Sequence, residues 1–209
     1  PSLHRRFVSA VHGDDPEALE ESFLELYAHL HLHEAPYTSD ERRSMDAAGG
    51  YWCHAGGISP VVRAGRWVRP ATVSADLGAG NGLQLLLLQR LHPHRLSVQV
   101  EISSGAVGMG RRLQEWLAIP AERGRWGVTD LMSADLPDAD LLYLYRPVRP
   151  DGRGADFYRR LAGHLQRRRD ETVILSIADC LAGFLDDSFG EIYGDGHLTC
   201  YRRPGVEPA

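Results

Sequence analysis

Hydrophobic residues recur along this 209-residue chain with two alternating spacings. Short apolar runs rich in Val, Ile and Leu are typical of buried strands, and longer stretches with an apolar residue every three or four positions are typical of helices. The two kinds of run alternate, which predicts an α/β fold with a doubly wound, Rossmann-like sheet, mostly parallel, and helices on its faces. Strands are expected at residues 72–75, 96–100, 125–129, 138–145 and 172–178.

The connecting segments have helical spacing, whereas the C-terminal end has a different pattern. Residues 189–193 and 197–202 are β-prone and are separated by Gly194-Asp195-Gly196, which predicts a closing antiparallel hairpin and a seven-stranded sheet. Helices are expected at residues 83–89, 104–117, 156–168 and 181–185.

The N-terminal part of the chain is predicted to form a small helical segment. Residues 1–15 are mostly polar and are expected to be partly disordered. Asp15-Pro16-Glu17 then supplies an N-cap, a proline at the first helical position and an early acid, which together predict a helix. A further helix is expected to begin at a capped first turn around Ser39. We therefore divide the chain into a helical cap segment, residues 1–58, and an α/β domain, residues 59–209.

Composition narrows the classes of partner. The apolar fraction of 43% and the charged fraction of 24% are ordinary for a globular protein. The formal net charge of −5 gives no global reason to expect a nucleic acid or an anionic membrane as partner. The 23 Lys and Arg residues are all Arg, which excludes any lysine-based mechanism.

Cysteine and hydropathy patterns exclude further classes. The three cysteines are odd in number and far apart, so we expect neither a disulfide framework nor a metal site. No apolar run approaches the roughly 20 residues of a membrane span. Residues 1–6 do not lead into the apolar segment of a signal peptide, and a cytoplasmic location is expected.

The most informative stretch is the turn between the first predicted strand of the sheet and the leucine-rich helix. It contains Asp76 followed by Gly78, Gly80 and Gly82. A strand that ends in a glycine-rich turn and continues as a helix presents backbone N–H groups at the edge of a sheet. Glycine suits this place because a Cβ atom would keep a ligand away from the main chain. The turn is therefore a candidate ligand site, with a ligand-free turn as the alternative.

Two kinds of ligand suit such a turn. The dinucleotide fingerprint G-x-G-x-x-G needs a third glycine where this chain has Leu83. The stretch D-L-G-A-G-N-G instead resembles the first motif of class I, seven-strand Rossmann-like S-adenosylmethionine methyltransferases. A carboxylate at the strand end is useful to the cationic amino acid moiety of that cofactor and unhelpful to a pyrophosphate. The resemblance implies cofactor binding by the whole motif, residues Asp76, Leu77, Gly78, Ala79, Gly80, Asn81 and Gly82.

Two further acids stand where such a cofactor would need them. Glu101 ends the second strand about 20 residues after Gly82, the offset at which a Rossmann-type acid meets ribose hydroxyls. An ionised carboxylate can accept both hydrogens of a cis-diol, so Glu101 and the adjoining Ile102 are assigned to the cofactor. By the resemblance, Asp130 accepts from the adenine amino group and the N–H of Leu131 donates to the ring.

The end of the fourth predicted strand is the candidate place for the methyl acceptor. Ligands of open α/β sheets bind beyond the carboxyl ends of the strands, near the topological switch point. Tyr145, Arg146 and Pro147 are therefore expected near the transferred methyl group. Amino-methylating members of the family often have Asn/Asp-Pro-Pro-Tyr/Phe at this place. The sequence here is Y-R-P-V, which argues against the adenine- and glutamine-methylating subclasses.

The cap segment and the catalytic groups are less clearly indicated. By the resemblance, Tyr37 and Tyr51 close the methionine end of the pocket and contact the substrate, with ordinary packing aromatics as the alternative. Candidate proton-accepting residues are His54, Tyr145 and Asp179.

We therefore predict an S-adenosylmethionine-dependent methyltransferase that releases S-adenosylhomocysteine. The methyl acceptor is either a small molecule or a protein side chain. The layout is loosely similar to the seven-strand, non-SET protein-lysine methyltransferase group. Two other functions are consistent with the residues: a nicotinamide-dependent Rossmann oxidoreductase, and a catalytically inactive S-adenosylmethionine-binding protein.

Overall fold

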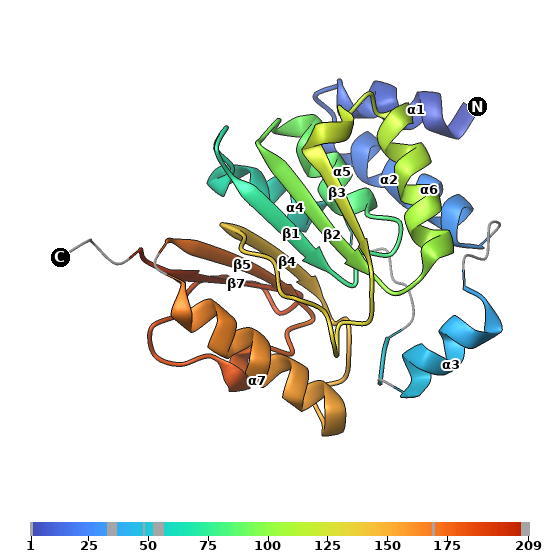
Figure 1. Ribbon diagram of the computed structural model, residues 1–209. Coiled ribbons are helices and arrows are strands. Elements are labelled where there is room, and N and C mark those ends of the chain that lie inside the picture. Colours follow the sequence, from blue (N-terminus) through green and yellow to red (C-terminus); the bar gives the residue numbers. More distant parts are fainter. Residues whose placement is uncertain (1, 33–36, 48, 52–56, 169, 206–209) are drawn as a thin grey trace.

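A seven-stranded sheet forms the centre of the protein (Figure 1). The computed structural model describes residues 2–32, 37–47, 49–51, 57–168 and 170–205. The strand order is β3-β2-β1-β4-β5-β7-β6. The strands are β1 (Val73–Leu77), β2 (Leu96–Glu101), β3 (Gly124–Val128), β4 (Leu141–Tyr145), β5 (Thr172–Ile177), β6 (Gly190–Gly194) and β7 (Leu198–Arg203).

Strands β1 to β5 are parallel, and β7 runs antiparallel to both β5 and β6. The predicted C-terminal hairpin is thus confirmed. Its turn is stabilised by Asp195, whose Oδ1 atom accepts from the backbone N–H groups of His197 and Leu198, at 2.9 and 2.8 Å. Gly196 in this turn has φ +85°, a conformation that favours glycine. The doubly wound α/β fold predicted from the hydrophobic pattern is confirmed.

Helices cover both faces of the sheet, and Figure 1 shows that the two faces differ. One face carries α4, α5 and α6, with α1 and α2 outside them, and the other face carries α7. Helix α3 lies apart from both layers, beyond the carboxyl ends of β1 and β2. The helices are α1 (Ser2–Val11), α2 (Pro16–Leu32), α3 (Ser39–Ala47), α4 (Ser59–Ala64), α5 (Leu83–Leu91), α6 (Ser104–Trp116) and α7 (Gly152–Arg167), and short 3₁₀ turns span Gly65–Trp67, Ala121–Arg123 and Ala182–Phe184.

Helix α5 is the centre of the larger hydrophobic cluster. Its leucines from Leu83 to Leu88 are fully buried, because α5 packs between the sheet and the N-terminal helices. A helix that is apolar on most of its circumference is expected in such an enclosed place. This packing fixes the glycine-rich turn that immediately precedes α5.

Two strands differ from the prediction by two residues or more: β1 continues to Leu77 instead of ending at residue 75, and β4 begins later than expected. The fourth strand was expected from residue 138, but β4 begins at Leu141. Asp138 and Asp140 instead form ion pairs with Arg168, each at 3.2 Å. The two acids therefore anchor the end of α7, and Asp140 also bonds through its backbone to Val73 of β1 and Val173 of β5, at 2.8 and 2.9 Å.

The expectation that residues 1–15 are partly disordered is wrong. Ser2–Val11 form α1, and Phe7 in this helix is fully buried. Phe7 packs in the same hydrophobic cluster as Phe23 and Leu26 of α2, and Arg6 forms an ion pair with Glu25 at 2.7 Å. A few apolar residues in a polar stretch are thus sufficient, because α2 supplies the complementary surface. No helix in the described parts of the chain is both long and apolar enough for a bilayer.

Replacing Phe7 with Ala should destabilise the protein by about 3 kcal/mol, because the substitution leaves a cavity in the main hydrophobic cluster. Urea denaturation measures the change in the free energy of unfolding. Leu24 on α2 is 41% exposed, so Leu24→Ala is the matched control and should cost less than about 1 kcal/mol. Equal losses for the two variants would show that α1 does not contribute to the folded core.

Candidate functional site

The glycine-rich turn after β1 requires glycine at all three predicted positions. Gly78, Gly80 and Gly82 have φ angles of +88°, +58° and +67°, which side chains other than glycine rarely adopt. The N–H groups of Gly78 and Ala79 donate to the carbonyl of Val100, at 2.9 and 3.0 Å. The turn is thus fastened to the end of the neighbouring strand β2.

Glu101, the last residue of β2, is held against this turn. Its Oε2 atom accepts from the N–H of Gly80 at 2.8 Å, and its Oε1 atom accepts from the N–H of Ser103 at 2.9 Å. The residue is only 4% exposed, and this burial raises the pKa of the carboxyl group, although the hydrogen bonds oppose the shift. A carboxylate can accept more hydrogen bonds than these two, so a ligand hydroxyl can also donate to Glu101.

Asp76 is the second buried acid of the site. It is 3% exposed, and the pKa of its carboxyl group is raised well above the usual value by burial and by the nearby charge of Glu101. In the sheet, Asp76 pairs with Tyr143 of β4, whose buried hydroxyl has no hydrogen-bond partner among the described residues. A buried carboxylate in this position favours either a proton or a cationic ligand.

The two acids line a cavity of about 290 Å³ at the carboxyl ends of the strands. Most of the residues predicted for cofactor and substrate meet there: Tyr37, Tyr51, Asp76, Gly78, Ala79, Gly80, Asn81, Glu101, Ile102, Asp130, Leu131, Tyr145, Arg146 and Pro147. Residues that sequence reasoning did not single out also line it: Tyr27, Met45, Gly50, Gln84, Tyr143 and Val148. Their apolar or neutral character gives no signal in the sequence, since only the folded packing brings them to the cavity.

Two residues of the glycine motif lie outside the cavity lining. Leu77 is 1% exposed and belongs to the hydrophobic cluster under α7. A Cβ atom at Gly82 would lie 1.8 Å from Oε1 of Gln99 and 2.5 Å from the ring of Trp126. Gly82 therefore allows the turn to pack closely against Gln99 of β2 and Trp126 of β3.

The other proposed proton acceptors are placed differently. His54 lies outside the described residues. Asp179 does not line the cavity, and its carboxylate accepts from Ser176 Oγ at 2.5 Å, from the N–H of Leu181 at 2.8 Å and from the hydroxyl of Tyr201. These contacts connect β5 with β7, which gives Asp179 a structural role. Of the two candidates within the described residues, Tyr145 is the one that lines the cavity.

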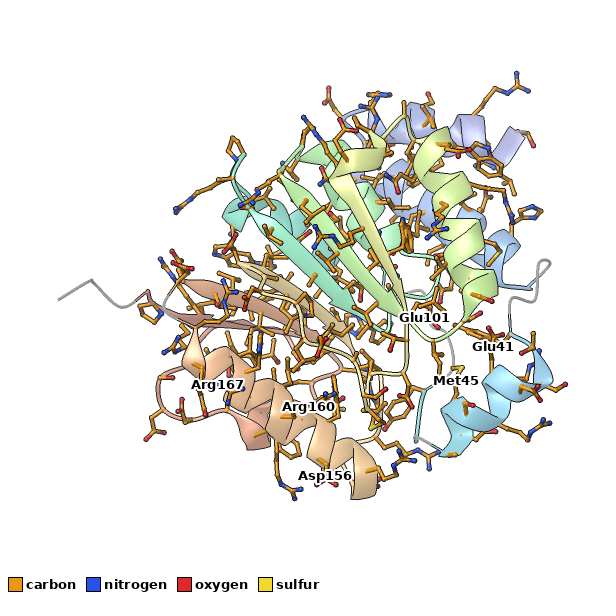
Figure 2. The ribbon with its side chains drawn as sticks, in the orientation of Figure 1. Glu41, Met45, Glu101, Asp156, Arg160 and Arg167 are labelled. Atoms are coloured by element: carbon orange, nitrogen blue, oxygen red, sulfur yellow. The ribbon has the colours of Figure 1, made fainter. Side chains whose placement is uncertain are left out.

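Helix α3, which belongs to the N-terminal cap segment, covers one side of the cavity. The helix begins at Ser39, as expected, and its capping residue is Thr38: Thr38 Oγ1 accepts from the N–H of Glu41, and Glu41 accepts from the N–H of Thr38. Glu41 also accepts from the N–H of Ser104 at the start of α6, at 3.0 Å. Figure 2 shows Glu41 and Met45 of α3 on the side of Glu101. The cap is thus attached beside the ribose-binding candidate.

A second attachment joins the cap to the segment after β4. Gly50 forms an antiparallel bridge with Val148, and the N–H of Arg149 donates to the carbonyl of Gly49 at 2.9 Å. On its other side this segment touches the glycine turn, because a Cβ atom at Gly78 would lie 2.8 Å from Cβ of Pro147. The cap, the glycine turn and the segment after β4 therefore enclose one space.

The loop after β3 is fixed by hydrogen bonds from two directions. Asp130 Oδ1 accepts from the N–H of Met132 at 2.9 Å, which forms a tight turn within the loop. Arg160 of α7 donates to the carbonyl of Ala134 at 2.9 Å and to the carbonyl of Leu131. Figure 2 shows Arg160 in the middle of α7. The loop that carries Asp130 and Leu131 is therefore held at the cavity edge.

The strand order and the reversed last strand define the class I methyltransferase fold, and comparison with solved structures agrees. An RNA methyltransferase from Salinibacter ruber, solved with S-adenosyl-L-homocysteine, has a TM-score of 0.51 and 21% identity, covering 73% of this chain and 92% of that one. Magnesium protoporphyrin IX methyltransferase from Synechocystis PCC 6803, solved with bound S-adenosylmethionine, has a TM-score of 0.51 and 11% identity, covering 86% and 95%.

A third similar structure, an O-methyltransferase family protein from Burkholderia thailandensis, has a TM-score of 0.53 and 14% identity, covering 96% of this chain and 63% of that one. No family model and no curated protein matches the chain. At these identities the likeness is one of fold.

Gly82→Ala should destabilise the protein even without a ligand, because the new methyl group meets the Trp126 ring and Gln99. Gly196→Ala is the matched control: Gly196 also has a positive φ, but a Cβ atom there meets no other group within 4 Å. We expect Gly82→Ala to cost about 2 kcal/mol more than the control, measured by urea denaturation. Similar losses would show that only backbone strain matters at Gly82.

Asp76→Asn should stabilise the ligand-free protein at neutral pH. The folded state raises the pKa of Asp76 above its unfolded value, so the stability contributed by this group is present at low pH and is lost as pH rises toward the folded pKa. An amide avoids the buried charge, and a gain of about 1 kcal/mol would raise the melting temperature by about 2–4 °C.

The gain should shrink as pH falls from 7 toward 4.5, and thermal denaturation at several pH values measures it. Asp135→Asn removes an exposed carboxylate and should leave the melting temperature unchanged. Destabilisation by Asp76→Asn at pH 7 would show that the Asp76 carboxylate has a stabilising partner in the free protein.

Proposed function

We propose that this protein binds S-adenosylmethionine in the cavity at the carboxyl ends of β1, β2 and β4 and transfers its methyl group to an acceptor. The observation that carries the proposal is the pair of buried carboxylates, Asp76 and Glu101, that line the cavity beside a positive-φ glycine turn. The fold supports it, because the similar structures include methyltransferases solved with S-adenosylmethionine or S-adenosylhomocysteine.

The acids fit this cofactor in charge. Asp76 is buried in the cavity wall and its ionised form lacks water, so it favours a ligand with a positive charge. The methionine part of the cofactor has an ammonium group, and the sulfur is also cationic. A dinucleotide would instead place a pyrophosphate at this turn, next to the Asp76 carboxylate. The nicotinamide alternative is therefore disfavoured by like-charge repulsion.

The cavity also has hydrogen-bonding groups that suit the ribose and the adenine of the cofactor. The carboxylate of Glu101 is oriented by Gly80 and Ser103, and its free lone pairs suit the two hydroxyls of a ribose. Asp130 uses one oxygen within its own loop, which leaves the other oxygen for the adenine amino group. The N–H of Leu131 is the proposed donor to the adenine ring. These assignments extend the resemblance residue by residue.

When bound, the cofactor supplies a methyl group that is activated by positively charged sulfur. The acceptor's lone pair forms the new bond to this carbon, the electrons of the carbon–sulfur bond return to sulfur, and S-adenosylhomocysteine results. The protein's own task is to exclude water and align the acceptor. Burial raises the pKa of Tyr145, so its hydroxyl stays protonated at neutral pH. We propose that Tyr145 orients the acceptor by hydrogen bonding and does not remove its proton.

Binding of S-adenosylhomocysteine and of 5′-methylthioadenosine, which lacks the amino acid part, tests this arrangement. Asp76→Asn should weaken S-adenosylhomocysteine about 10- to 100-fold, the usual effect of losing a charge-assisted hydrogen bond, and leave methylthioadenosine unchanged. Glu101→Ala should weaken both ligands, because both contain the ribose. Calorimetric titration measures the dissociation constants.

The melting temperature of each variant shows that it is folded before titration. Asp135→Asn again serves as the control and should bind both ligands as the wild type does. The proposal fails if the wild type shows no saturable binding of S-adenosylhomocysteine, or if it binds NADH more tightly.

A further inference from the structure

The segment after β4 places one cation at the cavity. Arg146 directly follows β4 and lines the cavity, and its φ of +39° is unusual for a residue with a side chain. The next residue, Pro147, packs against Gly78 of the glycine turn. Since backbone strain of this kind persists only where the surrounding structure enforces it, the position of Arg146 is a defined feature of the site.

Within the described part of the chain, the guanidinium group of Arg146 forms no ion pair with a carboxylate. Its Nη2 atom donates to the hydroxyl of Tyr51 at 2.9 Å, and its Cζ atom lies 4.3 Å from the centre of the Tyr51 ring. The buried Nε atom has no hydrogen-bond partner among the described residues. A guanidinium with neutral partners and an unused buried donor is suited to a bound oxyanion.

The acidic residues and the arginine that line the cavity come from different strands of the sheet. Among the described residues, the acids that line the cavity, Asp76, Glu101 and Asp130, belong to β1, β2 and the loop after β3. Arg146 follows β4, on the other side of β1 in the strand order. The acids therefore lie on the side proposed for the nucleoside and the methionine ammonium, and the arginine lies on the side left for the acceptor.

Resting on the proposed function, we infer that the methyl acceptor carries an oxyanion, a carboxylate or a phosphate, which Arg146 binds within the cavity. Tyr51 orients the guanidinium by stacking and by accepting its hydrogen bond, and Tyr145 provides an aromatic wall on the same side. A side chain such as that of lysine would bring a second cation to Arg146 and is disfavoured. The site thus selects oxyanions over amines.

The test uses protein saturated with S-adenosylhomocysteine and simple aromatic probes. Benzoate carries the carboxylate, benzamide has nearly the same shape without charge, and benzylamine carries a cation. Isothermal titration should show that benzoate binds at least tenfold more tightly than benzamide, the usual range for a charge-assisted pair, and that benzylamine does not bind. Phenyl phosphate, titrated in the same way, distinguishes a phosphate acceptor from a carboxylate acceptor.

Arg146→Gln should abolish the preference for benzoate over benzamide, and Arg146→Lys should restore part of it, since the charge returns without the planar fork. Arg167→Gln is the matched control: it removes the same charge from an exposed position at the end of α7, shown in Figure 2, and should leave the preference intact. Each variant is titrated at a concentration of S-adenosylhomocysteine that saturates it.

The two proposals fail separately. Absence of S-adenosylhomocysteine binding in the wild type overturns the proposed function. Normal binding of S-adenosylhomocysteine with equal affinities for benzoate and benzamide, or with a preference that survives in Arg146→Gln, overturns the inference alone. Binding of a short single-stranded RNA that depends on Arg146, without benzoate or phenyl phosphate binding, also overturns it in favour of a polymer acceptor.

Discussion

The carboxylate of Glu101, held by the N–H groups of Gly80 and Ser103, is the contact on which the rest of the site depends. It joins the end of β2 to the glycine turn after β1 and to the start of α6. Gly80 can donate only because the turn has positive φ angles, and the turn is fixed by the buried leucines of α5 that follow it. The hydrophobic core thus determines the position of a polar group at the cavity wall.

The two buried acids of the site reduce the stability of the folded protein when they are ionised. Asp76 and Glu101 are both buried, and burial raises the pKa of both carboxyl groups; the nearby charge of Glu101 raises the pKa of Asp76 further. A protein selected for stability alone would have neutral residues here, since burying a charge without a cation is unfavourable. The buried Asp76 carboxylate at the wall of a cavity is therefore an argument for a cationic ligand, independent of the fold.

Sequence reasoning predicted those parts that depend on local pattern. The strand–helix alternation, the hairpin around Gly196 and the glycine turn are all encoded by neighbouring residues, and the fold confirms them. Helix α1 was not predicted because Phe7 is buried by contacts with α2 and the larger cluster, which a local pattern does not show. Tyr143 was likewise missed: it reads as an ordinary strand residue, and only the pairing of β4 with β1 places it beside Asp76.

The cap segment explains why the acceptor side was harder to predict than the cofactor side. The cofactor acids follow from fixed offsets along consecutive strands, whereas the surroundings of Arg146 come from residues far apart in the chain, with Tyr51 lying 95 positions before it. The antiparallel contact of Gly50 with Val148 brings Tyr51 to Arg146, and the contact of Glu41 with Ser104 holds the other end of the cap. An acceptor site built from such contacts, as proposed for this protein, can change its specificity while the strand ends proposed for the nucleoside stay the same.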